Sequence, residues 1–146
     1  MDPTKIYLAQ TDTTVGFLSQ EASKLAKIKG RPSNKPFLIC VDSFATLRRF
    51  ARVPKTFRRF VRQSDKTTFI YPNVKAVRVV KDERHLRFLK KFGWMYSTSA
   101  NESGKRFDPA FAKSKADVIV EDSRGLFEGA PSKLLRLGRR RLRRVR

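Results

Sequence analysis

The sequence is short of acidic residues: 13 Asp and Glu stand against 34 Lys and Arg in 146 residues, a formal net charge of +21. An excess of one sign and this size attracts polyanions and makes contacts with nucleic acid strongly dependent on salt, but it carries no information on base specificity. With a single histidine and a single cysteine, the chain offers no His/Cys cluster for a metal. The composition therefore indicates a polyanionic partner and no metal centre.

Cysteine and long apolar runs are equally scarce. Cys40 lies inside a short apolar run, cannot form an internal disulfide, and is expected to be a small buried residue in a reducing compartment. No apolar run approaches the roughly 20 residues of a membrane span, and no secretory segment opens the chain. We therefore expect a cytoplasmic protein without a membrane partner. His85, in a basic helix-like run, is expected at the surface.

Hydrophobic residues make up 40% of the chain, enough for one domain with its own core. Short apolar segments alternate with helix-like ones, which predicts a single α/β domain, a twisted mixed sheet with helices packed on it. We place this domain at residues 1–138 and an arginine-rich tail at 139–146. Strands are expected at 5–9, 37–41, 67–71, 76–80, 94–98, 117–121 and 134–137, and helices at 20–28 after a Ser19 cap, 44–51 after a Ser43 cap, 54–61, 83–92 and 109–115.

A basic turn, residues 29–36, separates an expected helix from an expected strand. Arg31 precedes Pro32, and proline favours extended geometry in the residue before it. Side chains at i and i+2 of an extended chain point the same way, so Lys29 and Arg31 should reach one side together. An ammonium beside a planar guanidinium suits a polyphosphate. An ordinary solvated basic turn is the alternative, and this stretch alone does not decide between them.

Two further polar pairs follow expected strands: Thr11 with Thr13, and Ser99 with Asn101. Hydroxyls and amides can donate to phosphate or ribose oxygens without bulk, and loops at strand ends are where α/β proteins place ligand sites. The alternatives are a threonine-rich strand end and a common turn, because these residue types favour strands and turns in any case. Gly16, close after the threonines, indicates either a turn or a close backbone approach.

Arg78 lies between two valines of an expected strand and should point to the opposite face, toward either solvent or a cleft. The tail contains seven arginines from Arg136 to Arg146 and is expected to form either an edge strand or a disordered arm. It would contact phosphate backbones without reading bases. The alternative is that charge on an edge strand prevents that strand from pairing with strands of other chains. The predicted RNA-binding residues are Arg139, Arg140, Arg141, Arg143 and Arg144.

Three motifs in order resemble the YrdC/YciO family. They are Thr11-Asp12-Thr13-Thr14-Val15-Gly16, Lys29-Gly30-Arg31-Pro32 with Lys35-Pro36, and Ser97-Thr98-Ser99-Ala100-Asn101-Glu102-Ser103-Gly104. The family patterns are P-T-[DE]-T-x-Y-G, K-x-R-P and S-T-S-A-N-x-S-G, and the resemblance runs from about residue 6 to 138. The last motif is long and specific, so the three together carry more weight than any one of them.

The resemblance implies a twisted α/β sheet around a basic concave cleft. It implies an L-threonylcarbamoyladenylate synthase, a nucleotidyltransferase that joins threonine, bicarbonate and ATP, releases pyrophosphate and serves threonylcarbamoyladenosine modification of tRNA. The implied partners are ATP, L-threonine, bicarbonate, tRNA and the threonylcarbamoyl-transferase machinery, with Mg²⁺ sharing the phosphate charge. The alternative is a non-catalytic family member that binds double-stranded RNA, tRNA or ribosomal RNA.

The resemblance also implies roles for individual residues. Lys29 and Arg31 would act in catalysis and hold phosphates. The nucleotide would further meet Ser99, Asn101 and Arg78, and the threonine and carbamate pocket would contain Thr11, Thr13, Thr68 and Ser132. The chain departs from the family pattern at Gln10, Val15, Ser64, Asp65 and Lys133, on the threonine side more than on the phosphate side. The sequence therefore favours nucleotide or RNA binding over the complete synthase reaction.

Overall fold

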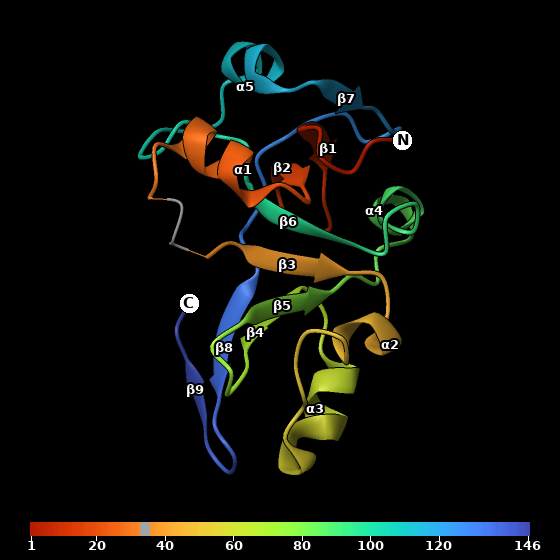
Figure 1. Cartoon of the computed structure of the whole chain (residues 1–146), viewed down its shortest axis with the longest axis vertical. Coiled ribbons are helices and arrows are strands. Elements are labelled where there is room, and N and C mark those ends of the chain that lie inside the picture. The colour runs from red at the N-terminus through yellow and green to blue at the C-terminus, as the bar shows by residue number, and fades with distance from the viewer. Residues whose placement is uncertain (33–35) are drawn as a thin grey trace. The chain divides into compact units, whose positions relative to one another are not determined.

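The computed structural model describes residues 1–32 and 36–146, so Ser33 to Lys35 of the basic turn lie outside the described residues. The described chain divides into two compact units (Figure 1). The first unit is Met1–Phe37 with Met95–Pro131, and the second is Leu38–Trp94 with Ser132–Arg146.

The first unit contains four neighbouring strands in the order β7-β1-β2-β6. β1 pairs antiparallel with β2 and parallel with β7, and β6 pairs antiparallel with β2. Apolar side chains from these strands and from both helices of the unit form a buried core, among them Leu8, Phe17, Leu25 and Ala112. The element bounds are β1 Tyr7–Gln10, β2 Val15–Ser19, α1 Ala22–Lys29, β6 Trp94–Ser99, α5 Pro109–Lys115 and β7 Val118–Val120.

The second unit contains five neighbouring strands in the order β3-β5-β4-β8-β9. β5 is parallel to β3 and antiparallel to β4, while β8 is parallel to β4 and antiparallel to β9. The bounds are β3 Leu38–Val41, α2 Phe44–Leu47, η1 Lys55–Phe57, α3 Arg58–Gln63, β4 Thr67–Ile70, β5 Ala76–Val79, α4 Glu83–Leu89, β8 Lys133–Leu137 and β9 Leu142–Arg144. Both units thus have a mixed sheet with helices, as the sequence predicts.

Local end signals correctly predict the starts of α2 and α5 and the end of α1, whereas the helix expected at 44–51 ends at Leu47, that expected at 54–61 is η1 followed by α3, and that expected at 83–92 ends at Leu89. The Ser43 hydroxyl accepts the Thr46 N–H at the start of α2, and the Asp108 carboxylate accepts the Ala110 N–H at the start of α5, where Pro109 occupies the first turn. Gly30 ends α1 at φ 62°, a left-handed geometry that glycine adopts without strain. The expected capping of the first helix by Ser19 is wrong. Ser19 is the last residue of β2, which the sequence did not reveal, and the helix begins after Glu21.

The tail forms an edge strand: β9 pairs with β8 from Leu135↔Arg144 to Leu137↔Leu142. Cys40 is buried, as expected. The expected surface position of His85 is wrong, because its ring is 1% exposed and stacks on Phe88 from the inner face of α4. Among the described residues, no helix is long and apolar enough to span a membrane.

Candidate functional site

Lys29 joins two of the sequence motifs. Its side chain lies at the end of α1 and is largely buried, and its ammonium donates to the Ser99 carbonyl at 3.0 Å and to the Asn101 carbonyl at 2.6 Å. A third acceptor, Asn101 Oδ1, lies at 3.3 Å. Burial, and then the nearby charge of Arg31, lower the pKa of Lys29. All three acceptors are neutral, so the ammonium is fixed in position while its charge is not cancelled by them.

The loop after β6 is held by its own polar side chains. The Ser99 hydroxyl donates to Asn101 Oδ1 at 2.5 Å, and Asn101 Nδ2 donates to the carbonyls of Glu102 and Lys105. The Ser103 hydroxyl donates to the Lys29 carbonyl at 2.7 Å, so the loop also fastens the end of α1. Asn101 therefore shapes the loop, while the exposed Ser99 hydroxyl keeps lone pairs open at its rim.

The expected extended geometry of this stretch is wrong at Lys29. Lys29 is helical, and the left-handed Gly30 turns the chain before Arg31. The Arg31 guanidinium lies 4.5 Å from the centroid of the Phe37 ring, a cation–π contact that fixes it. Its charge contributes, after burial, to the lowered pKa of Lys29.

The structure brings Thr11 and Thr13 together in the turn between β1 and β2. Their hydroxyl oxygens lie 3.3 Å apart, and the Thr11 hydroxyl donates to the Thr14 carbonyl. A Cβ added to Gly16 would lie 3.1 Å from the Thr98 carbonyl, so the close-approach prediction for this glycine is confirmed. Gly16 pairs with Ser99. The threonine turn and the serine loop are therefore neighbours at one end of this sheet.

A segment that the sequence did not single out, residues 122–129, lies against the threonine turn. Gln10 Oε1 accepts the Phe127 N–H at 2.8 Å, and the Phe127 carbonyl accepts the Val15 N–H. The Gly129 N–H donates to the Thr14 hydroxyl at 2.9 Å. The side chain of Gln10, one of the positions that depart from the family pattern, thus anchors this segment, and that departure was the available signal.

Thr68, Ser132 and Arg78 meet inside the second unit. The hydroxyls of Thr68 and Ser132 lie 2.8 Å apart, and Arg78 Nη1 is 3.5 Å from the Thr68 hydroxyl. Arg78 is 2% exposed, so the solvent-facing alternative for this residue is wrong. Its guanidinium reaches the hydroxyl of a residue on β4, the strand that pairs antiparallel with β5.

Arg146 completes this group, and the sequence analysis did not identify it as a site residue. Its Nη2 donates to the Ser132 hydroxyl at 3.2 Å, and its Nε donates to the Ser132 carbonyl at 3.1 Å. Its backbone N–H donates to the Leu134 carbonyl, so the backbone hydrogen bonding between the β8 and β9 segments extends to Arg146. Burial and the charge of Arg78 lower the pKa of Arg146. Two guanidiniums beside two hydroxyls form a site suited to an oxyanion.

The remaining predicted residues are the tail arginines. Arg139, Arg140 and Arg141 are exposed between β8 and β9, and Arg143 and Arg144 are exposed on β9. The described residues contain no group of three or more His, Cys, Asp or Glu side chains that could hold a metal ion. The polar residues thus form one cluster in each unit and one exposed arginine row.

Comparison with known proteins identifies the fold. The chain resembles Sua5 of P. abyssi in complex with L-threonine (TM-score 0.79, 21% identity, covering 97% of this chain and 50% of Sua5). It also resembles E. coli YciO (0.76, 18%, 98% and 82%) and full-length HypF in a phosphate- and nucleotide-bound form (0.75, 16%, 97% and 26%). The chain thus spans only half the length of Sua5.

At these identities the similarity establishes the α/β fold alone. No match was found among curated proteins. The family model Sua5_yciO_yrdC, described as telomere recombination, matches residues 5–143. This match covers nearly the whole sequence and agrees with the order of the three motifs: the chain belongs to the Sua5/YciO/YrdC family.

Proposed function

We propose that this chain is an L-threonylcarbamoyladenylate synthase that serves tRNA modification. The observation that carries the proposal is the contact of Lys29 with Ser99 and Asn101, which fixes a buried cation beside a hydroxyl-rich loop. The nucleotide in the HypF structure and the L-threonine in the Sua5 structure support ligands of these two classes. ATP, L-threonine and bicarbonate would be the substrates, in the cytoplasm, where tRNA would receive the product.

The proposed reaction needs charge neutralisation and alignment more than a strong base. Threonine and bicarbonate first form a carbamate with loss of water. A carbamate oxygen then bonds to the α-phosphorus of ATP while the bond from that phosphorus to the bridging oxygen breaks, and pyrophosphate leaves with the electron pair. Lys29 and Arg31 would neutralise the charge that develops on the phosphate oxygens. The Ser99 hydroxyl and the Thr11–Thr13 pair would align the nucleotide and the carbamate.

In the second unit, Arg78 and Arg146 would hold an oxyanion beside Thr68 and Ser132. Both arginines contact these hydroxyls. Mg²⁺ would travel with the ATP phosphates, as it commonly does, because the described residues offer no carboxylate and imidazole cluster for it. We assign it no contact with a residue of this chain.

The test is release of pyrophosphate from ATP and bicarbonate, with and without threonine, by the intact chain. Release that depends on threonine is expected. The Lys29→Ala variant should lower the rate by about 100-fold or more, on the scale of losing one preorganised electrostatic group. Lys27→Ala is the matched control, because Lys27 is an exposed residue of the same helix. Release that is indifferent to threonine would falsify the proposal.

A second candidate function is RNA binding without catalysis. It is favoured by the five exposed arginines at residues 139–144, which stand on the β8–β9 hairpin without an acidic residue among them. Removal of five phosphate contacts should flatten the salt dependence of binding to a short RNA duplex, since each contact releases a counterion. If replacing these arginines with Ser leaves both the affinity and the salt slope unchanged, this candidate fails.

A further inference from the structure

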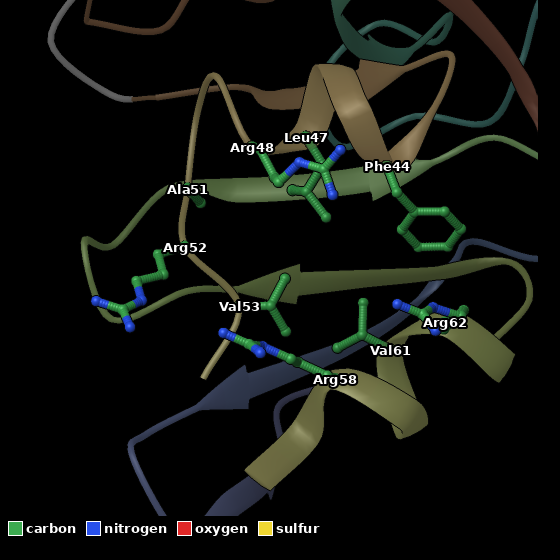
Figure 2. A pocket seen from close by; sticks show the side chains of 9 residues that line it. All are labelled: Phe44, Leu47, Arg48, Ala51, Arg52, Val53, Arg58, Val61 and Arg62. Carbon is green, nitrogen blue, oxygen red and sulfur yellow. The ribbon is translucent and has the colours of Figure 1, made fainter. Parts of the chain in front are cut away.

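We propose that a groove in the second unit, separate from the residues above, binds an acidic amphipathic helix of a partner protein. The groove has a volume of about 460 Å³ and lies between α2 and the η1–α3 segment (Figure 2). Its lining combines apolar side chains with arginines: Phe44, Leu47, Arg48, Ala51, Arg52, Val53, Arg58, Val61 and Arg62.

The floor of the groove is mainly aliphatic. Leu47, Ala51 and Val61 are buried, while Phe44 and Val53 are half-buried. α2 is a helix of four residues and α3 one of six, and the half-buried Phe44 and Val53 are the apolar side chains of the lining that a partner would cover further. An apolar stripe on a partner helix, with residues at i, i+3, i+4 and i+7, would fill such a floor.

The rim of the groove is entirely positive. Arg48, Arg52, Arg58 and Arg62 are all exposed, and no acidic residue lines the groove. Figure 2 shows Arg52 at one end of the groove and Arg62 near the other, with Val53 and Val61 between them. Arg58 and Arg62 are four residues apart on α3, so their like charges repel along one helix face. Carboxylates of a bound partner would remove this repulsion and accept paired hydrogen bonds from the guanidiniums.

The aliphatic floor favours a protein partner over RNA. RNA would satisfy the arginines with phosphates, but its bases stack on aromatic rings. Phe44 is the one aromatic residue among those lining the groove, and the Lys81 ammonium already lies 5.9 Å from the centroid of its ring. A partly apolar centre with arginine around it is the usual composition of a protein interface. The groove therefore fits leucine-like anchors flanked by Glu or Asp.

The test uses two fluorescein-labelled peptides of equal composition, each made of Leu, Ala and Glu and long enough for about four helical turns. In one peptide the leucines form a single helical stripe, and in the other they are spread around the helix. Binding is measured by fluorescence anisotropy with the intact chain at about 0.15 M salt, where long-range attraction is screened. A fluorescein-labelled RNA duplex is the third ligand, measured in the same way.

The decisive variants are R48E/R58E in the groove and R49E/R59E as their control. Arg49 and Arg59 are exposed neighbours of the groove residues but do not line the groove, so both variants change the net charge equally. We expect the striped peptide to bind at least about 10-fold more tightly than the scrambled one. We expect R48E/R58E to weaken that binding by about 10-fold or more, since like charges then face each other, and R49E/R59E to change it by less than about 3-fold.

Absence of saturable binding, equal affinity for both peptides, or equal effects of the two variants would each overturn the proposal. The proposal is also overturned if R48E/R58E weakens binding of the RNA duplex more than binding of the striped peptide, since the groove would then be an RNA site. Pyrophosphate release should be the same in both variants. The groove proposal and the proposed synthase function therefore fail or stand separately.

Discussion

The hydroxyl groups of Thr68 and Ser132 lie 2.8 Å apart in the interior of the second unit, although 64 residues separate them in the sequence. Each hydroxyl also meets a guanidinium, Arg78 for Thr68 and Arg146 for Ser132. Because buried polar groups need partners, the Thr68 and Ser132 hydroxyls and Arg78 depend on one another, and the exposed Arg146 adds a contact to Ser132. The same contacts that would place an oxyanion site therefore also contribute to stability.

The first prediction concerns this hydroxyl pair. Ser132→Ala and Thr68→Val should each lower the free energy of unfolding by about 1 kcal/mol, because each removes the contact between the two buried hydroxyls and leaves the other with its guanidinium alone. The double variant should lose about 1 kcal/mol less than the sum of the single losses. Urea unfolding of the four proteins measures this difference.

The control for this cycle combines Thr68→Val with Ser114→Ala. Ser114 is exposed on α5 and donates only to a carbonyl of its own helix, that of Phe111, in the contacts described. Its effect should add to that of Thr68→Val within about 0.5 kcal/mol. If the Thr68–Ser132 cycle is just as additive, the coupling between the two hydroxyls does not exist.

The second prediction concerns the start of α5. Asp108→Ala should cost about 1 kcal/mol, because the Ala110 N–H loses its side-chain acceptor, while Asp108→Asn should keep most of the stability. The free energy of unfolding of the three proteins decides this. An Asn variant as unstable as the Ala variant would show that the hydrogen bond to Ala110 is not what holds the helix end.

Signals carried by neighbouring residues were sufficient to predict much of the fold. The caps at Ser43 and Asp108 and the helix end at Gly30 depend on contacts within a few residues, so the sequence reveals them. β2 depends on pairing with β1 and with the distant β6. Its short apolar run has no local signal that separates it from the preceding threonine turn, and it was missed for that reason.

The candidate site shows the same division. The three motifs identified Lys29 and Ser99 without any knowledge of how they meet, and the structure supplies their contact. The contact of Arg78 with Thr68 depends on the pairing of β5 with β4, which the sequence left open. Arg146 reaches Ser132 only because the last strand folds back along β8, and an arginine-rich tail gives no indication of which arginine does so.

The third prediction concerns pH and Tyr71. Burial raises the pKa of this phenol above its ordinary value of 10.0. The unfolded chain therefore loses the proton first as the pH rises, and in this range the native state binds more protons, so stability falls with increasing pH. The contribution of the buried, protonated Tyr71 phenol to the free energy of unfolding is fully present below pH 10.0 and is lost progressively above it.

Tyr71→Phe should remove this part of the alkaline loss. Its free energy of unfolding should fall less between neutral pH and about pH 11 than that of the unchanged chain, because phenylalanine has no proton to release. Tyr96→Phe, at a half-buried position, is the control for loss of a phenol as such. If Tyr71→Phe and the unchanged chain lose stability in parallel across this range, the burial of Tyr71 has no effect on the pH dependence.

The fourth prediction concerns the packing of Gly129 on the threonine turn. A Cβ added at Gly129 would lie 2.2 Å from the Thr13 carbonyl oxygen, a backbone atom that cannot move aside by a rotamer change. Gly129→Ala should therefore cost roughly 2 kcal/mol or more and displace the 122–129 segment. Amide hydrogen exchange should rise at Val15, whose N–H donates to the Phe127 carbonyl.

Gly125→Ala separates this steric effect from backbone strain. Gly125 has φ 71° and open space around its Cα, so an alanine there costs about 1 kcal/mol through its left-handed geometry alone. It should leave exchange at Val15 unchanged, since that N–H bonds to Phe127 and not to Gly125. If the two variants are equally stable and protect Val15 equally, Gly129 does not set the fit of this segment. If Gly129→Ala alone exposes Val15, the segment anchored by Gln10 depends on that fit, and the proposed threonine pocket depends on the same glycine.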